Sequence, residues 1–469
     1  MSDTLQARAA LAFDEMNLAA LPGNLQRNSL RHYYLSIWPP ITSMRDYADS
    51  EYPAYPDTVT NLYMHVPFCS GACSFCNYYF QVTDPSARPG RIASFLADLR
   101  QDVALHAERA DIRTSYLYVG GGTPSLIPPE QLASFFEWMR AQEIFADSWW
   151  GTVELHPELF RDLGAASEFL DACRRSGIGR VSLGIQELSG DILRDNNRRH
   201  GVDLYERAIG LIGDKGLIHN LDLMYGMPGQ SKDDWERTLR FAASQQPDSI
   251  SIYFLFLNGK TALAQRVASG RAMLPPYREV QELHIMAQLF LEESGYCELP
   301  SDFFSKHPTP GLKERTGSLP SAAHVLPIGP GSYGYFDQTQ FTNHFSEDAW
   351  REAVRARRRP IWRGHRHSAG EAFRRDLMFS LKNSFGIDLG GIAKAWGDDA
   401  VNAVTPLFDL LLAEELVVRD PAGLSLSRKG RLCAEEIAWL FSPPLPEAGS
   451  SSASSRKAAA AHSFSPSYR

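Results

Sequence analysis

Residues 61–80 read NLYMHVPFCSGACSFCNYYF, and this stretch carries the strongest prediction about the fold. Its first six residues, NLYMHV, are mostly apolar and β-type, so they predict a strand. The cysteines Cys69, Cys73 and Cys76 follow on the predicted loop after that strand. Thiolates are soft ligands that suit zinc or an iron–sulfur cluster. The stretch therefore predicts a metal centre beyond the end of the first strand of a sheet.

The number of cysteines bears on the identity of that metal. A structural zinc site needs four ligands, often in two paired knuckles. Here three cysteines lie close together without a nearby fourth, and His65 falls on the predicted strand just before Pro67. Three thiolates on a four-iron cluster leave one iron open, although ordinary clusters take four cysteines. The spacing therefore favours a cluster with an open iron over zinc.

Strand-like runs alternate with helix-like segments from residue 61 onward. Two amphipathic segments, 91–106 and 129–140, carry apolar residues at helical spacing. This alternation predicts an α/β fold in which a parallel sheet has helices outside it. Six such units would make a partial (β/α)6 barrel, whose chemistry lies at the carboxyl ends of the strands. Besides NLYMHV, the predicted strands are SYLYVG (115–120), GTVELH (151–156), RVSLGIQ (180–186), LDLMYG (221–226) and SISIYFL (249–255).

Composition and pattern divide the chain into five regions. Aromatic residues in the first region favour a packed cap over a flexible arm. The third region combines a long helical pattern with a Gly- and Pro-rich, irregular stretch, and its basic run at 355–367 is interpreted as a solvated face. The regions are a leader or cap (1–58), the partial barrel (59–260), a barrel extension on the substrate side (261–368), a small winged-helix-like domain (369–443) and a Ser- and Ala-rich tail expected to be disordered (444–469).

The bulk properties exclude some classes of partner and site. The formal net charge of -8 argues against nucleic acid or an anionic membrane as the main partner. The start, MSDTLQARAA, lacks the apolar core of a secretory signal, and we expect a cytoplasmic protein. Six cysteines, three of them clustered, do not make a disulfide framework. Cys173, Cys297 and Cys433 lie in helical or apolar patterns and are expected to be buried, inert thiols.

The cysteine stretch resembles the cluster motif of the oxygen-independent coproporphyrinogen III oxidase (HemN-like) family of radical S-adenosylmethionine (SAM) enzymes. The resemblance covers about residues 60 to 440 and leaves out only the leader and the tail. It continues, in the same order along the chain, through GGGTPSL (120–126), VELHPE (153–158), RVSLGIQEL (180–188), LRDNNRRH (193–200), NLDLMYGMPGQ (220–230) and IGPGSYGYF (328–336).

The resemblance implies a 4Fe–4S cluster on Cys69, Cys73 and Cys76 and two SAM molecules. In such enzymes an electron from the cluster cleaves the first SAM to methionine and a 5′-deoxyadenosyl radical. The resemblance assigns Tyr63, Gly121 and Glu154 to the first SAM. It assigns to the second SAM the residues Phe75, Gly122, Thr123, Gln186, Arg198 and Asp222, with Phe256 as an adenine contact and Asp222 also as a catalytic residue.

Each of these residues also has a simpler interpretation. Glycines 120–122 can form a tight turn, because glycine permits positive φ. Glu154 and Asp222 can be rim carboxylates, and Arg198 a surface charge. The chemistry nevertheless suits SAM: a carboxylate can bind an amine or a ribose, and an arginine can bind a carboxylate.

The sequence leaves the reaction open between several members of the family. A coproporphyrinogen oxidase normally has one further cysteine soon after the cluster, whereas here Cys76 is followed by Asn77-Tyr78-Tyr79-Phe80. We favour transfer of a SAM-derived methyl or methylene carbon to an sp2 carbon of a natural product, as C-methylation or cyclopropanation. The alternatives are an anaerobic haem-degrading methyltransferase, a coproporphyrinogen III dehydrogenase and a non-catalytic haem chaperone. The expected partners are a small-molecule substrate and an electron donor such as flavodoxin or ferredoxin; a partner methyltransferase is a further alternative.

Overall fold

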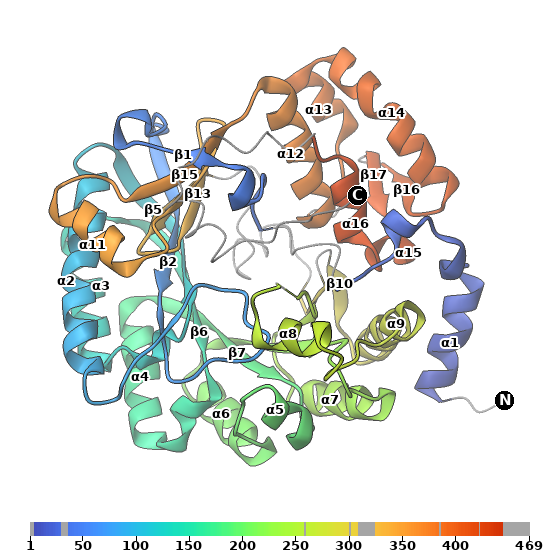
Figure 1. Cartoon of the computed structure of the whole chain (residues 1–469), viewed down its shortest axis with the longest axis horizontal. Coiled ribbons are helices and arrows are strands. Elements are labelled where there is room, and N and C mark those ends of the chain that lie inside the picture. Colours follow the sequence, from blue (N-terminus) through green and yellow to red (C-terminus); the bar gives the residue numbers. More distant parts are fainter. Residues whose placement is uncertain are drawn as a thin grey trace.

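The computed structural model describes residues 4–29, 36–257, 259–299, 302–307, 324–383, 386–421 and 423–443. The sequence forms one large mixed sheet with helices packed outside it, and a smaller helical part follows at the carboxyl end (Figure 1). The large sheet has 13 strands in the order β1-β15-β14-β13-β12-β2-β5-β6-β7-β8-β9-β11-β10. The predicted tail, 444–469, lies outside the described residues.

The middle of this sheet confirms the predicted α/β partial barrel. All six predicted strands are present, and each pairs in parallel with the next. They are β2 (Thr58–Val66), β5 (Asp111–Gly121), β6 (Phe145–Leu155), β7 (Ile178–Gln186), β8 (Ile218–Tyr225) and β9 (Ser249–Phe254). The helices between and after them are α2 (Arg88–Ala107), α3 (Pro129–Ala141), α4 (Leu163–Ser176), α6 (Val202–Asp214), α7 (Lys232–Ser244) and α9 (Tyr277–Glu293).

Local sequence explains where these helices begin, end and pack. Helix α7 starts with a capping box in which Ser231 and Asp234 satisfy each other's free backbone N–H groups. Helix α4 ends at Gly177, whose φ of 92° is the left-handed conformation that stops a helix. Helix α2 buries Phe95 and Leu99 against the sheet, as its apolar spacing predicts.

The prediction of an irregular stretch before residue 368 was wrong for its described part at 324–368. It contains four strands that extend the sheet beside β2, together with a helix. Proline and glycine within these short strands hid them, because both residues are normally strand breakers. Glycine at 334 makes room for Pro327, since a Cβ there would lie 2.4 Å from the Pro327 Cδ. The elements are β12 (Val325–Ile328), β13 (Tyr333–Phe336), β14 (Thr339–Asn343), α11 (Glu347–Arg355) and β15 (Ile361–Arg366).

The basic run at 355–367 is mostly paired within the protein rather than free in solvent. Arg355 binds Asp98, and Arg359 binds Asp49. Arg363 is buried in β15, where its Nη1 donates to the carbonyl oxygen of Met44 at 3.1 Å. The expected solvated face is therefore wrong for Arg363, and the run helps to attach the leader to the sheet.

The described part of the leader packs on the barrel. Helix α1 (Leu5–Glu15) lies along α9, where the rings of Phe13 and Tyr277 are 6.1 Å apart. Trp38 is fully buried, and β1 (Arg45–Asp46) pairs with β15. The leader thereby covers one side of α9 and the far edge of the sheet.

The carboxyl-terminal elements follow the predicted order of helices and then a hairpin. Their domain boundaries and their winged-helix-like character stay predictions. Within the described ranges, none of the helices is both long enough and apolar enough to cross a membrane. The elements are α12 (Ala369–Asn383), α13 (Leu389–Trp396), α14 (Asp398–Ala413), β16 (Val417–Asp420), β17 (Gly423–Leu426), α15 (Arg428–Arg431) and α16 (Ala434–Leu440).

Candidate functional site

The three clustered cysteines lie in a segment that crosses the carboxyl ends of the barrel strands. Strand β3 (Phe68–Cys69) pairs with β4 (Gln81–Val82), so the chain closes a loop around Cys73 and Cys76. All three thiols are partly buried and free. Thr123 donates its hydroxyl to the Cys69 Sγ at 3.6 Å, and Arg198 donates to the Cys73 Sγ at 3.5 Å.

The three cysteine thiols are suitable metal ligands for an iron–sulfur cluster. Burial raises the pKa of Cys69 to about 11 and that of Cys76 to about 12. Such thiols ionise only when a metal supplies positive charge, which is how metal binding displaces thiol protons. Over the described residues, no three His, Cys, Asp or Glu side chains are grouped to hold a single metal ion. An iron–sulfur cluster does not require such a group, because each of its three cysteine thiolates binds a different iron atom.

The glycine turn after β5 packs tightly against the cysteine segment. A Cβ at Gly121, where φ is 109°, would lie 2.6 Å from the His65 ring, and a Cβ at Gly122 would lie 2.6 Å from the Phe68 carbonyl oxygen. The Gly122 amide donates to Val66 and the Thr123 amide to Phe68, both at 2.7 Å. These amides therefore hold the cysteine segment in place and are not free for the second SAM, to which the resemblance assigns both residues.

Glu154 lies at the end of β6, beside the glycine turn. Its carboxylate accepts from the Tyr118 hydroxyl at 2.6 Å and from the Gly121 amide at 3.2 Å. Burial raises the pKa of Glu154 to about 7, although the bond from Tyr118 opposes this shift. The carboxylate is thus held in a fixed position next to the backbone of the turn, as a ribose contact requires.

Gln186 and Arg198 meet above Gly184 at the end of β7. A Cβ at Gly184 would lie 2.9 Å from the Gln186 Nε2 and 3.7 Å from an Arg198 Nη atom. Gln186 takes a left-handed backbone conformation, with φ at 71°. The Gln186 Oε1 and the Arg198 Nε are buried without a hydrogen-bond partner. Buried polar atoms are rarely left unpaired, so both atoms are available to a polar ligand.

Asp222 lies on the neighbouring strand, β8, where it pairs in register with Gly184. It accepts hydrogen bonds from Ser182 and from Asn220, both at 2.8 Å. Burial raises its pKa, and the hydrogen bond from Ser182 and the charge of Arg180 oppose the rise. Arg180 rather than Arg198 is thus the cation that acts on Asp222.

The predicted aromatic contacts line the rest of the site. The Tyr63 hydroxyl is 2.9 Å from the His65 Nδ1, and its ring packs on Tyr333. Phe75 is buried in a small apolar cluster that also includes Leu255, Leu257 and Leu263, with Cys73 packed against it. The carbonyl oxygen of Phe256 accepts from the Asn77 side chain at 2.8 Å, which ties the end of β9 to the segment after Cys76.

Two histidines beside Arg198 were not assigned a role from sequence. The rings of His156 and His200 are 5.2 Å apart. Burial, and then the charge of Arg198, lower the pKa of His156 well below its usual value and that of His200 to about 3. Both imidazoles are therefore neutral next to the arginine and add no further positive charge.

Sequence reasoning also missed the polar residues inside the barrel. Tyr118, Arg180, Ser182 and Asn220 surround the two carboxylates. The signal was the period of two: positions 180, 182, 184 and 186 of β7 carry Arg, Ser, Gly and Gln, whereas the positions between them are apolar. A strand whose alternate residues are polar faces a polar interior.

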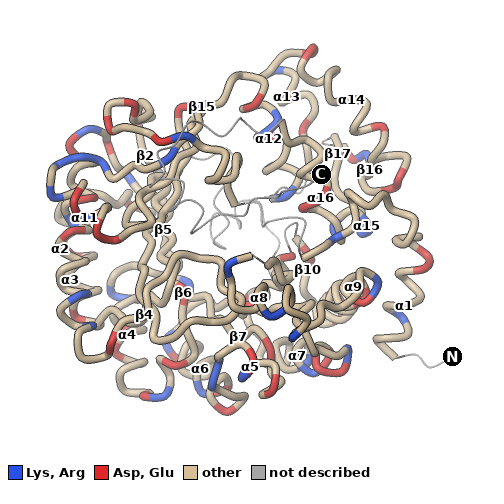
Figure 2. Tube along the Cα trace, in the orientation of Figure 1, with Lys and Arg blue, Asp and Glu red and all other residues tan. Residues whose placement is uncertain are grey.

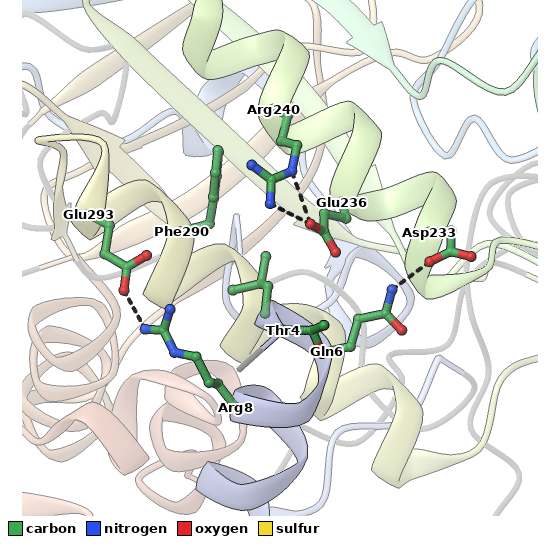
Figure 3. A pocket seen from close by; sticks show the side chains of 9 residues that line it. Thr4, Gln6, Arg8, Asp233, Glu236, Arg240, Phe290 and Glu293 are labelled. Carbon is green, nitrogen blue, oxygen red and sulfur yellow. Dashed lines mark hydrogen bonds and ion pairs between the residues drawn. The ribbon is translucent and has the colours of Figure 1, made fainter. Parts of the chain in front are cut away.

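A separate surface pocket lies between α1, α7 and α9, away from these residues (Figure 3). It has a volume of about 490 Å³. Its charged side chains pair with one another: Arg8 with Glu293, and Arg240 with Glu236. With its charges already paired, this pocket gives no reason to assign a ligand to it.

Comparisons with known proteins agree with this geometry. Residues 63–242 match the Radical SAM superfamily, whose domain uses a 4Fe–4S cluster and SAM. The chain is 27% identical to the haem chaperone HemW of Mycobacterium tuberculosis, over 81% of this chain and 94% of that protein. It is 28% identical to the oxygen-independent coproporphyrinogen III oxidase of Paracoccus denitrificans, over 81% and 86%. The structure of coproporphyrinogen III oxidase (HemN) from Escherichia coli shares the fold, with a TM-score of 0.72, 24% identity and coverage of 82% and 91%.

Proposed function

We propose that this chain, whose residues 63–242 match the Radical SAM superfamily, is an enzyme that binds two SAM molecules and acts on a tetrapyrrole. The observation that carries the proposal is the pair of polar groups above Gly184, with Gln186 and Arg198 each keeping a buried polar atom free. They lie beside Cys73, and their chemistry suits the amino-acid end of a second SAM.

The first SAM site combines the cysteine segment with the end of β6. Cys69, Cys73 and Cys76 would hold the cluster, which supplies the electron that cleaves SAM. Glu154 would accept hydrogen bonds from the ribose, since Tyr118 and Gly121 fix its position. Tyr63 closes the side next to the glycine turn and excludes water.

The second SAM site would use the ends of β7, β8 and β9. Arg198 would bind the carboxylate of SAM and Gln186 its amine or carboxylate. Asp222, held by Ser182 and Asn220, would accept a donor from the ribose or the amine. Phe75, Thr123 and Phe256 would supply the walls of the site. Two cofactors held this way can meet without diffusing, which is the advantage of a preorganised site.

The relatives support a tetrapyrrole as the substrate class. Both groups of relatives, the coproporphyrinogen oxidases and the haem chaperones, are named for tetrapyrroles, and the chain aligns along most of their length. Oxidation of a propionate side chain, as in coproporphyrinogen III oxidase, is therefore the reaction we place first. A non-catalytic haem carrier is the alternative that would not use the second SAM.

Carbon transfer from SAM to an sp2 carbon is a second candidate. It is favoured by the run Asn77-Tyr78-Tyr79-Phe80 directly after Cys76, which lacks the further cysteine that the oxidases normally carry soon after the cluster. Such a reaction would deliver a methyl or methylene group to a natural product or open a tetrapyrrole, with or without a partner methyltransferase.

One anaerobic experiment tests these alternatives together. The reconstituted protein is incubated with methyl-labelled SAM, dithionite and either coproporphyrinogen III or haem. Formation of 5′-deoxyadenosine with loss of carbon dioxide from coproporphyrinogen supports the oxidase, and label in the product supports carbon transfer. If the protein binds haem but does not cleave SAM, the proposal that it is an enzyme fails and a haem carrier is the better interpretation.

A second experiment tests the metal centre. Alanine at Cys69, Cys73 and Cys76 should abolish the iron content and the brown colour, and alanine at the distant Cys173 should not. Stable zinc without iron after anaerobic reconstitution would contradict the proposal.

A further inference from the structure

The turn between the first two cluster cysteines lies at the surface. Ser70, Gly71 and Ala72 are exposed, whereas the cysteines on either side are partly buried. This turn is therefore a place where another protein can approach the metal centre closely.

Three segments border this part of the cysteine segment: two bind the turn itself by hydrogen bonds, and the third binds Ser74, just after Cys73. Ser70 donates to Glu158 of η6 (Pro157–Arg161) at 2.8 Å. Asn197, just after α5 (Gly190–Asp195), donates to the carbonyl oxygen of Ala72 at 2.8 Å. The amide at the start of α8 (Ala262–Ala268) donates to Ser74 at 2.9 Å. The turn and its borders thus form one continuous surface.

This surface is basic in an otherwise acidic protein. Without the buried Arg198, its bordering segments, 157–162, 190–200 and 260–273, carry six Lys or Arg and four Asp or Glu, whereas the whole chain has 47 and 55. Blue segments in Figure 2 mark this excess beside α8. Two of the four acids, Asp191 and Asp195, are paired with Arg194 and Arg266. The exposed basic residues are Arg161, Arg194, Arg199, Lys260 and Arg271.

Exposed apolar side chains gather on the same segments. Met273 is 82% exposed and lies two residues after Arg271, the one basic residue between α8 and Met273. The described residues include nine large exposed apolar side chains, and five of them lie in or next to the cluster segment and its borders: Tyr78, Val82, Leu163, Val202 and Met273. Single exposed apolar residues are ordinary, but such a concentration amid charges is typical of a protein-binding surface.

We propose that this basic surface docks an acidic, one-electron carrier protein that reduces the metal centre. The inference rests on the proposed function, because reductive cleavage of SAM needs an electron from outside. The reduced carrier loses one electron. That electron breaks the bond between C5′ and sulfur of SAM, which leaves methionine and a 5′-deoxyadenosyl radical. Complementary charge speeds the encounter of two such proteins, and the exposed methionine adds apolar contact.

The test compares two triple variants of the full-length, reconstituted protein. The docking variant carries Arg199→Glu, Arg271→Glu and Met273→Glu. The control carries Arg174→Glu, Arg175→Glu and Leu410→Glu, and all three positions are exposed. The two arginines lie at the carboxyl end of α4, which is at the opposite end of the barrel from the cysteine segment. Binding of an acidic flavodoxin is measured by calorimetry at low and at high salt.

The docking variant should weaken flavodoxin binding by about tenfold or more at low salt, and high salt should weaken wild-type binding in the same way. The control should bind like wild type. SAM cleavage driven by flavodoxin should fall in the docking variant, whereas cleavage driven by dithionite should not. Wild-type binding by the docking variant would overturn the docking surface, and so would an equal loss of dithionite-driven cleavage. If wild type cleaves no SAM with either reductant, the proposed function fails. In that case the docking surface would still be supported if flavodoxin binding depends on salt and only the docking variant loses it.

Discussion

The guanidinium of Arg198 bridges Cys73 and Gly184: its Nη1 lies 3.5 Å from the cysteine Sγ, and its Nη2 donates to the glycine carbonyl oxygen. One side chain therefore contacts both a candidate cluster ligand and the end of β7, where the second SAM is proposed to bind.

Replacing Arg198 by leucine should make the metal centre harder to reduce and weaken the second SAM. Hydrogen bonds to cluster sulfurs raise the reduction potential, and a hydrogen bond to a charged group contributes about 1.5–3 kcal/mol. A redox titration followed by electron paramagnetic resonance measures the first effect, and calorimetry with SAM measures the second. The adjacent, exposed Arg199→Leu is the control. A wild-type potential in Arg198→Leu would refute the contact with the cluster.

Asp222→Ala should weaken the second SAM site by on the order of 1.5–3 kcal/mol, because a charge-assisted hydrogen bond is lost. Formation of 5′-deoxyadenosine should persist, since the first site depends on Glu154 and Gly121 instead. The stoichiometry of SAM binding and the ratio of product to 5′-deoxyadenosine measure the two effects. Asp203→Ala, whose side chain is 83% exposed on α6, is the matched control. If the Asp222→Ala variant forms the full amount of product, Asp222 does not belong to the second SAM site.

The sequence predicted the barrel well because each barrel strand is a long apolar run followed by a helical pattern. The cysteine spacing, the glycine turn and Glu154 at the end of its strand could be placed at one end of the barrel from strand order alone, whereas Asp222 lies within β8, three residues before its end. That prediction needs only the rule that parallel strands end on the same side of a sheet.

Contacts between distant segments could not be predicted in the same way. That the amides of Gly122 and Thr123 are already used by Val66 and Phe68 depends on how two strand ends pack. Pro327 fits into the sheet because the neighbouring Gly334 has no Cβ, which would lie 2.4 Å from the Pro327 Cδ. Cys297 was expected to be buried, but it is exposed at the start of β10 (Cys297–Leu299), because that short strand is the last of the sheet. Cys173 and Cys433 are buried, as predicted.

The contribution of Glu154 to the stability of the protein should fall between about pH 4.5 and 7. The pKa of Glu154 is raised from 4.5 to about 7 by burial, so the folded chain keeps a proton that the unfolded chain has lost. Unfolding then becomes easier as pH rises through this window, by at most about 3 kcal/mol, and no further above it. Urea unfolding of wild type and Glu154→Gln should show the difference, since glutamine cannot titrate. Parallel pH profiles for the two proteins would contradict the assignment.

Arg27 should tie the leader to the carboxyl-terminal helix. Its side chain is only 1% exposed and lies 3.7 Å from Glu436 of α16 and 3.6 Å from Asp302. Its guanidinium also donates to the Tyr225 hydroxyl at the end of β8. Four parts of the chain therefore meet at one buried cation.

Arg27→Met should destabilise the protein by about 3–5 kcal/mol, because it leaves buried carboxylates without their counter-ion. Arg27→Met combined with Glu436→Gln should recover part of this loss, since the charge that was left unpaired is removed as well. Urea unfolding measures both, and Arg45→Met, which removes an ion pair at the surface, should change stability by less than about 1 kcal/mol. If the double variant were as unstable as the sum of its two single variants, the ion pair would not be what couples the leader to α16.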